Sequence, residues 1–368
     1  DEDSDISATL GMVDIIETQK QIPLNISLPQ SGHIAVYGSS GTGKTTLLQT
    51  IIFSLTTKYS PEMLNIFAFD FGGRNLGNLS LPHCVNVAFG DEEDKISYMF
   101  EQILECIETR KVLFAKNNCA AYESYLATTK NKLPAVLLVL DNYAVFREKM
   151  FRNEDDLIRI AANAKAYGIY LIVTGNSKNA IYYKVSEHIS NNITLRMNDK
   201  MNYRDILNVS IPIEPDNIKG RGLTVFNKKA VEIQAALPLE AENEADRAEK
   251  LNKIYSAMAQ AYNGADAASL YSVSSNENGK SVVSEENTTK SPAVSTRKAP
   301  STLPAVNDDD HTIVCGSSVV SGQLQGFEMR NTANVFIGIN GSEYPNRLFE
   351  RIINLNNAVF YDICSPAA

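Results

Sequence analysis

The sequence lacks any run of about 18 to 20 consecutive apolar residues, the length that a membrane-spanning helix requires. It also lacks the basic and apolar regions of a secretory signal peptide, because it starts with the acidic residues Asp1, Glu2 and Asp3. We therefore expect these residues to form a soluble segment.

Cysteine is scarce, and no two cysteines form a CxxC pair. Their number is odd and their positions are scattered, which indicates neither a disulfide framework nor a zinc site. A reducing cytosol fits this pattern best. The five cysteines are Cys84, Cys106, Cys119, Cys315 and Cys364.

Positive charge is also in deficit, because 34 lysine and arginine residues stand against 43 acidic residues and leave a formal net charge of −9. Such a chain is not attracted on average to the phosphate backbone of nucleic acid, although the total allows a local basic patch. Length and apolar content are sufficient for a folded protein. The 368 residues, 44% of them hydrophobic, can form one large domain and a smaller one.

Short apolar, β-rich runs alternate with amphipathic stretches between residues 31 and 236, an order typical of a mainly parallel sheet covered by helices. Residues 93–116 carry apolar side chains at three-to-four spacing, which predicts a helix with one face on the sheet. The predicted fold class is therefore α/β. Strands are expected at residues 33–37, 64–70, 135–140, 169–174, 193–197 and 222–226.

The composition changes toward the end of the chain. Residues 240–263 predict one more helix, with Gly264 as a left-handed cap. Residues 264–310 are mostly polar and too poor in apolar side chains to fold, which predicts a disordered linker. We expect a first domain over residues 1–263 and a partial second module over residues 311–368. Apolar patterning resumes there at residues 334–339, 346–355 and 358–363.

A glycine-rich segment between a predicted strand and a predicted helix matches the phosphate-loop pattern G-x-x-x-x-G-K-[ST]. Its glycines let backbone N–H groups approach the phosphates of a nucleotide, and the helix that follows adds a favourable dipole. Lys44 is expected to reach the β- and γ-phosphates of ATP, and Thr45 to hold Mg²⁺ through its hydroxyl. A glycine-rich turn without a ligand is the alternative. The predicted ATP-binding residues are Gly38, Ser39, Ser40, Gly41, Thr42, Gly43, Lys44, Thr45 and Thr46.

A buried acidic residue is expected to hold the Mg²⁺ ion together with Thr45. Asp141 directly follows the strand predicted at residues 135–140, so it reaches the edge of the sheet beside the phosphates and is predicted to coordinate Mg²⁺. The next residue is Asn142, at the position where P-loop motors that hydrolyse ATP usually have a glutamate that activates water. An amide cannot accept that proton. Lys44, Asp141 and Asn142 are the predicted catalytic residues, and ATP hydrolysis by this site is expected to be weak.

Polar residues at other strand ends are candidates for contact with the γ-phosphate, and the sequence does not choose among them. Residues 70–74, Asp-Phe-Gly-Gly-Arg, also end a strand, and their glycines are compatible with a mobile loop that faces a central pore. At Thr174 and Asn176, a simple turn at the end of the strand is the alternative to contact with the γ-phosphate. The candidates for the γ-phosphate are Thr174, Asn176, Arg196 and Arg221.

The last module repeats, in weaker form, the order of residues 35–70: a strand, a glycine loop, a helix and a strand that ends in aspartate. In register, Tyr344 and Pro345 stand where Lys44 and Thr45 stand in the first copy. Chance similarity over so short a stretch is the alternative. A true repeat would bind nucleotide poorly or not at all.

Together these segments resemble the FtsK/SpoIIIE ATPase family, and within it the ATPase modules of type VII secretion motors. The resemblance covers roughly residues 7–260 and does not depend on the phosphate loop alone. The segments that carry it are residues 11–14, 19, 21, 32–36, 38–45, 70–73, 81–83, 110–114, 140–143 and 220–222.

The resemblance implies a RecA-like P-loop domain that binds ATP and Mg²⁺ in the cytosol, in a motor that other parts of the full protein anchor in the membrane. It also implies neighbouring ATPase modules, a hexamer as the working form, and small helical WXG-type proteins as exported substrates. Family members commonly complete the site with an arginine from the neighbouring subunit, and Asn192 aligns with that arginine. Because Asn142 and Asn192 stand where a glutamate and an arginine are usual, the resemblance predicts ATP binding more securely than ATP hydrolysis.

Three hypotheses for the function remain. The first is an ATP-binding module of a type VII secretion motor, in which nucleotide sets module contacts and substrate docking more than it drives fast turnover. The second is an FtsK-like DNA translocase, which the acidic net charge and the lack of a basic DNA-reading helix near the C-terminus disfavour. The third is an interaction scaffold whose last module offers an apolar groove to a helical export signal.

Overall fold

The computed structural model describes residues 6–15, 19–77, 79–211, 214–262, 264 and 267, together with the backbone of residues 312–317 and 324–328. The chain divides into two units, Asp1–Ser274 and Ser275–Ala368. In the second unit, the described part is an antiparallel pair of strands, β11 (Thr312–Ser317) and β12 (Leu324–Glu328). Nearly all of the predicted linker, the predicted repeat and the apolar segments after residue 330 lie outside the described residues.

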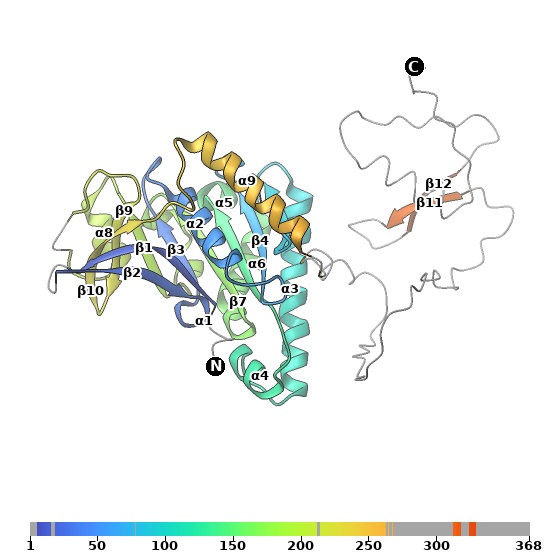
Figure 1. Ribbon diagram of the computed structural model, residues 1–368. Coiled ribbons are helices and arrows are strands. Elements are labelled where there is room, and N and C mark those ends of the chain that lie inside the picture. The colour runs from blue at the N-terminus through green and yellow to red at the C-terminus, as the bar shows by residue number, and fades with distance from the viewer. Residues whose placement is uncertain are drawn as a thin grey trace, which may run out of the picture. The chain divides into compact units, whose positions relative to one another are not determined.

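The first unit is built on a ten-stranded sheet with the strand order β2-β1-β10-β9-β8-β3-β7-β6-β4-β5 (Figure 1). The six strands from β8 to β5 pair in parallel, whereas those from β2 to β8 pair antiparallel. The sheet is therefore mixed, and its parallel half is the predicted α/β core. The strands are β1 (Ser7–Ile15), β2 (Lys20–Ser27), β3 (Ile34–Tyr37), β4 (Leu64–Asp70), β5 (Cys84–Phe89), β6 (Ala135–Asp141), β7 (Ile169–Gly175), β8 (Asn191–Leu195), β9 (Arg221–Phe226) and β10 (Lys229–Ala235).

All six predicted strands are present, as β3, β4, β6, β7, β8 and β9. Strands β1, β2, β5 and β10 were not predicted. The central strands β4, β6 and β7 are buried at every position, which gives continuous apolar runs. Strands β2 and β5 lie at the two edges of the sheet, and β10 is mostly half-buried, so their apolar signal is weaker.

Helices cover both faces of the sheet. The long helix α3 confirms the helix predicted over residues 93–116, and its apolar face is buried as expected. None of the helices in the described residues is both long and apolar enough to cross a membrane. The helices are α1 (Leu28–Ser31), α2 (Lys44–Thr56), α3 (Glu93–Lys116), α4 (Tyr122–Thr129), α5 (Tyr143–Lys149), α6 (Glu154–Asn163), α7 (Tyr183–Ser186), α8 (Lys200–Leu207) and α9 (Glu244–Ala261), with short 3-10 turns η3 (Phe151–Asn153), η4 (Ala164–Tyr167) and η5 (Lys178–Ala180).

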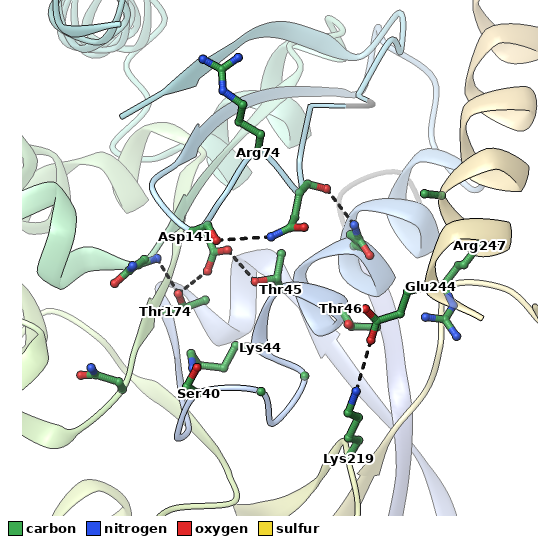
Figure 2. Close-up of a pocket in the computed structure, with 18 of the residues that line it drawn as sticks. Ser40, Lys44, Thr45, Thr46, Arg74, Asp141, Thr174, Lys219, Glu244 and Arg247 are labelled. Atoms are coloured by element: carbon green, nitrogen blue, oxygen red, sulfur yellow. Dashed lines mark hydrogen bonds and ion pairs between the residues drawn. The ribbon is translucent and has the colours of Figure 1, made fainter. Parts of the chain in front are cut away.

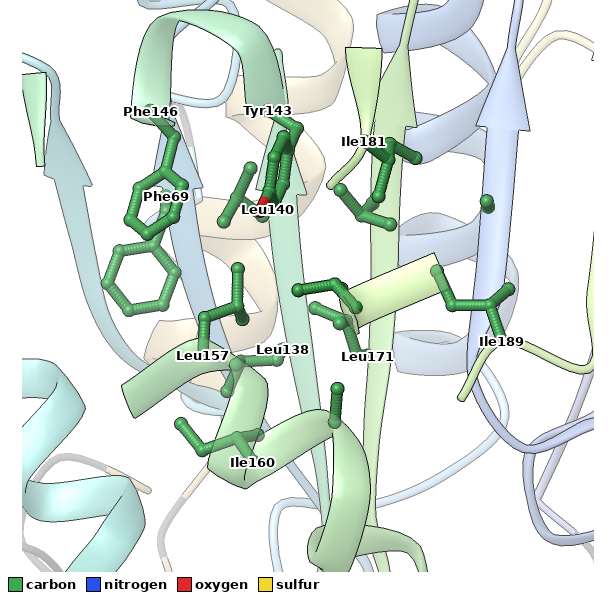
Figure 3. Close-up of a cluster of buried hydrophobic side chains, with 14 of the residues drawn as sticks. Phe69, Leu138, Leu140, Tyr143, Phe146, Leu157, Ile160, Leu171, Ile181 and Ile189 are labelled. Atoms are coloured by element: carbon green, nitrogen blue, oxygen red, sulfur yellow. The ribbon is translucent and has the colours of Figure 1, made fainter. Parts of the chain in front are cut away.

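Alternate side chains of the central strands enter two separate cores. Phe69 of β4 packs against Phe100 of α3, with ring centroids 4.9 Å apart, and Phe146 of α5 joins the same cluster (Figure 3). Ala68, the neighbour of Phe69 in β4, faces the opposite cluster, which contains Tyr255 of α9 and the buried side of α2. Each fully buried side chain of the size of phenylalanine contributes roughly 1.5–3 kcal/mol. The parallel strands are therefore held rigidly from both sides.

Helix α9 differs from its prediction at both ends. It begins at Glu244 rather than at residue 240, because the Asn243 side chain caps it and accepts the Asp246 N–H at 2.9 Å. It ends at Ala261, and Tyr262 continues in extended backbone with φ −85°. Gly264 does not adopt the left-handed conformation. The predicted glycine cap was wrong because the helix already ends at Ala261 and leaves through the extended Tyr262.

His33 provides a pH dependence of folding. It is buried just before β3, its Nδ1 accepts the Leu171 N–H at 2.9 Å, and burial lowers its pKa from 6.5 to about 4. Between these pH values the unfolded chain binds a proton that the folded chain does not, so stability falls as the pH drops. From this residue alone, the free energy of unfolding should be about 2 kcal/mol lower at pH 5 than at pH 7.5. Urea denaturation at both pH values measures the difference, and His33→Gln should reduce it. An undiminished difference in the variant would contradict the assignment to His33.

Candidate nucleotide-binding site

The strand ends that the sequence singled out meet at one edge of the parallel sheet. Strands β3, β7 and β6 are neighbours, and they end at Tyr37, Gly175 and Asp141. Because the carboxyl ends of parallel strands share one edge, the loops that follow them surround a common space. A cavity of ≈ 660 Å³ opens there (Figure 2). This volume is typical of a small-molecule site, for which the usual range is about 300–1,000 Å³.

The phosphate loop connects β3 to α2 and is shaped by close contact with its neighbours. Gly43 has a φ of 104° and stands at the N-cap of α2, a conformation that favours glycine. The Gly220 N–H donates to the Thr42 carbonyl at 3.0 Å, and the Ser39 N–H donates to the Arg196 carbonyl at 2.9 Å. The loop therefore opens at the N-terminus of a 13-residue helix, where the helix dipole favours an anion.

Lys44 lies inside the phosphate loop. Its Nζ donates to the carbonyls of Gly38 at 2.7 Å and Ser39 at 3.0 Å. Burial lowers the pKa of Lys44, and the nearby Asp141 carboxylate opposes this shift. Phosphate oxygens carry charge and accept stronger hydrogen bonds than carbonyls do, so they can draw the ammonium away from these two acceptors. The residue is thus placed where the motif predicts it.

Asp141 is the centre of a cluster of oxygen atoms. It is 2% exposed, and its Oδ2 and Oδ1 accept hydrogen bonds from Thr45 Oγ1 at 2.7 Å and Thr174 Oγ1 at 2.6 Å. Burial raises the pKa of Asp141, against the opposing effect of the two hydroxyl donors. Carboxylate and hydroxyl oxygens are ligands that suit Mg²⁺. The two residues predicted to hold the metal, Thr45 and Asp141, are therefore in direct contact.

Asn142 uses its side chain as a donor. Its Nδ2 donates to the Phe71 carbonyl at 3.2 Å, and its backbone N–H donates to Thr174 Oγ1 at 2.8 Å. The residue has a φ of 67°, a left-handed conformation that asparagine tolerates better than most residues. Of the described residues that line the cavity, only Asp141 and Glu244 are acidic. Asp141 is hydrogen-bonded to two threonines, and Asn142 carries an amide. Neither residue therefore offers a free carboxylate that could accept a proton from water.

The loop that follows β4 is tied to this site. Asp70 is buried and accepts the N–H groups of Gly72 and Leu76, each at 2.8 Å. Gln49 of α2 donates to the Asn75 carbonyl at 2.9 Å. These bonds close the segment into a compact turn beside the Asp141 cluster, which accounts for the aspartate and the glycine of the Asp-Phe-Gly-Gly motif.

Gly72 packs so closely on the Asp141 carboxylate that a side chain should disturb the site. A Cβ at this position would lie 2.6 Å from Asp141 Oδ2, so the carboxylate would have to turn away from Thr45. We expect Gly72→Ala to weaken Mg²⁺-dependent ATP binding about tenfold or more, as loss of ligand orientation does in other metal sites. Titration calorimetry with and without Mg²⁺ tests this. Gly77→Ala, in the same loop but away from the carboxylate, is the control. Equal Mg²⁺-dependent affinities in the two variants would contradict the expectation.

The four candidates for contact with the γ-phosphate separate into two groups. Thr174 and Asn176 line the cavity, whereas Arg196 and Arg221 do not. Arg221 is instead 3.7 Å from Glu232 of the neighbouring strand. Asn192 also lies outside the cavity lining and donates to the Ile206 carbonyl at 3.2 Å.

Of the predicted loop residues, Ser40, Gly41, Gly43, Lys44, Thr45 and Thr46 line the cavity, whereas Gly38, Ser39 and Thr42 shape the loop from behind. Arg74 lines the rim, but it pairs with Asp91 at 2.6 Å, and Figure 2 shows its side chain directed away from Asp141. Six lining residues were missed because they lie outside the sequence motifs. They are Gln49, Asn75, Lys219, Glu244, Arg247 and Ala248.

The described geometry is that of a phosphate loop beside a buried aspartate, and comparison with known proteins places it in a family. The family model for FtsK/SpoIIIE matches residues 3–211. The chain belongs to the FtsK/SpoIIIE family.

Several curated relatives of this FtsK/SpoIIIE chain are secretion proteins. The type VII secretion system protein EssC of Staphylococcus aureus (strain MRSA252) is 30% identical over 243 residues, which is 65% of this chain and 16% of the relative. The ESX secretion system protein YukB of Bacillus subtilis (strain 168) is 29% identical over 189 residues, 51% of this chain and 13% of the relative. The chain thus spans about one-sixth or less of the length of these relatives.

Solved structures of EssC and EccC share the fold of this chain. EssC (ATPases 2 and 3) from Geobacillus thermodenitrificans has a TM-score of 0.68 at 23% identity, covering 89% of this chain and 59% of that one. EccC (ATPases 2 and 3) from Thermomonospora curvata, in complex with a signal sequence peptide, has a TM-score of 0.65 at 23% identity, covering 88% of this chain and 56% of that one. The chain is therefore homologous to the ATPase domains of type VII secretion systems and has their P-loop ATPase fold.

Proposed function

We propose that this chain is the ATP-binding module of a type VII secretion motor, and that nucleotide binding rather than rapid hydrolysis is its main role. The observation that supports the proposal is the arrangement of Lys44, Thr45 and Asp141 around one cavity, beside an Asn142 amide that is bonded to the Phe71 carbonyl. These three residues would hold a metal-bound triphosphate. At position 142, the described site has an amide where a carboxylate would activate water.

Each residue of the cluster has a separate task in this proposal. Lys44 holds the β- and γ-phosphates, and the loop at the start of α2 holds the phosphates through its N–H groups. Thr45 and Asp141 hold Mg²⁺, which neutralises phosphate charge when bound. Thr174 keeps the Asp141 carboxylate oriented through its 2.6 Å hydrogen bond. All four residues line the same cavity.

The partners follow from the relatives. We propose that this module works on the cytosolic side with neighbouring ATPase modules in a hexamer, and that other segments of the full protein anchor it in the membrane. The proposed cargo is small WXG-type proteins. Support comes from the EssC and YukB similarity and from the EccC structure, which contains a signal sequence peptide.

Calorimetry and phosphate release on the same preparation test the proposal. We expect Mg·ATP to bind with micromolar affinity, and phosphate release to stay near the uncatalysed background. An absence of binding heat would refute the ATP-binding role. Rapid hydrolysis would refute the binding-dominated role, and salt-sensitive stimulation of hydrolysis by duplex DNA would favour a DNA translocase instead.

A further inference from the structure

The nucleotide cavity has a second wall that no phosphate-loop motif predicts. Its lining includes Lys219, just before β9, and Glu244, Arg247 and Ala248 at the start of α9. Figure 2 shows Glu244 and Arg247 on the same side of the cavity as Thr46 and Lys219, with Asp141 and Thr174 on the other side. The cavity therefore extends from the metal-binding cluster, past the start of α2, to α9.

This wall is fixed to the phosphate loop. The Gly220 N–H bonds to the Thr42 carbonyl at 3.0 Å, and Gln234 of β10 donates to the Lys219 carbonyl at 3.1 Å. Helix α9 rests on α2, because Tyr255 is 1% exposed and its ring centroid lies 6.4 Å from that of Phe53. The start of α9 thus keeps its position relative to Lys44 and Thr45, which are carried by the same α2.

Arg247 stands out in this wall because its charge is not matched. Its Nε is buried and has no hydrogen-bond partner, and within the described part of the chain the residue forms no ion pair. The adjacent Lys219 is different, since its Nζ lies 3.3 Å from Glu244 Oε1. A buried guanidinium donor without an acceptor is costly, and a ligand beside it would remove that cost.

The orientation of a nucleotide in the cavity decides which ligand group meets Arg247. Lys44 reaches the β- and γ-phosphates, and Thr45 and Asp141 mark the metal at that end. The α-phosphate then lies toward Thr46, so the sugar and base continue toward Lys219 and α9. A planar guanidinium stacks on the face of an aromatic ring and donates in a fixed plane, which suits a purine base.

We infer that Arg247 of α9 contacts the base of the bound nucleotide and gives the site its preference for a nucleotide over a bare triphosphate. This inference rests on the proposed function, because it requires that ATP binds in this cavity. It assigns the selectivity for the base to a helix that follows the phosphate loop by some two hundred residues, and not to the loop itself.

Two probes distinguish the contact with the base from the contact with the phosphates. Affinities of Mg·ATP and of Mg²⁺ with inorganic tripolyphosphate are measured by calorimetry for the wild type, Arg247→Ala, Arg247→Lys and the control Lys253→Ala. Lys253 lies on the same helix, does not line the cavity, and pairs with Glu249. We expect Arg247→Ala to weaken ATP binding about tenfold and to leave tripolyphosphate binding unchanged. Arg247→Lys, which keeps the charge but loses the planar group, should lose most of the same affinity.

The outcomes separate the two proposals. Unchanged ATP affinity in Arg247→Ala, or an equal loss for ATP and tripolyphosphate, would overturn the contact with the base while leaving ATP binding intact. A wild type that binds neither probe would overturn the proposed function itself. Hydrogen exchange provides a second readout: ATP should protect the amides at the start of α9, and tripolyphosphate should not. Equal protection by both probes would count against the inference.

Discussion

Replacing Lys44 with alanine is expected to weaken Mg·ATP binding about 100-fold or more. The substitution removes the ammonium that bonds to the β- and γ-phosphates, and hydrogen bonds to charged groups are worth roughly 1.5–3 kcal/mol each. In the free site, Nζ bonds to the Gly38 and Ser39 carbonyls, and the phosphates must displace these bonds. Their absence in the variant therefore offsets only part of the loss, because phosphate oxygens accept stronger hydrogen bonds than carbonyls do. Titration calorimetry at a fixed Mg²⁺ concentration measures the loss.

A matched variant shows whether the loss is specific to the site. Lys58 follows the same helix α2 but is exposed and lies outside the cavity lining. Lys58→Ala should bind ATP as the wild type does, and thermal unfolding should show that the Lys44 variant remains folded. If Lys44→Ala retained wild-type affinity, the phosphate loop would not be the ATP site, and the proposed function would fail with it.

Introducing a carboxylate at position 142 is expected to raise the rate of ATP hydrolysis about 10- to 100-fold. A positioned general base typically accelerates such reactions by about 10² to 10⁴-fold, and a base introduced without further optimisation should reach the lower part of that range. In Asn142→Glu, the bond from Nδ2 to the Phe71 carbonyl is lost, which releases the new side chain toward the cavity. The left-handed φ of 67° makes glutamate cost roughly 1 kcal/mol of stability there.

Asn142→Gln is the matched control for this gain. It has the length of glutamate and the same backbone cost, but its amide cannot accept a proton. Phosphate release under saturating ATP should therefore rise in the glutamate variant alone. An equal rise in both variants would mean that release of the Phe71 contact, and not the carboxylate, limits turnover. A wild type as fast as Asn142→Glu would show that the module already possesses a base.

The candidate site was predictable as far as it depends on local pattern. A phosphate loop is one continuous segment with a strand before it and a helix after it, so its glycines, Lys44 and Thr45 can be located from order alone. Asp141 was found in the same way, because a fully buried strand is an unbroken apolar run and its last residue must reach the edge of the sheet. The edge strands were missed because half-buried strands mix polar and apolar positions.

The parallel core, the phosphate loop and the amide at position 142 can be predicted from the order of residues alone, since each depends on neighbours in the chain. Three contacts became visible only in the folded chain: Gly72 packs on Asp141, Asn142 donates to Phe71, and Arg247 lines the cavity. The partners in these contacts are far apart along the chain. Contacts between residues from different strands and helices depend on how those elements pack, and no local pattern of residues encodes that packing.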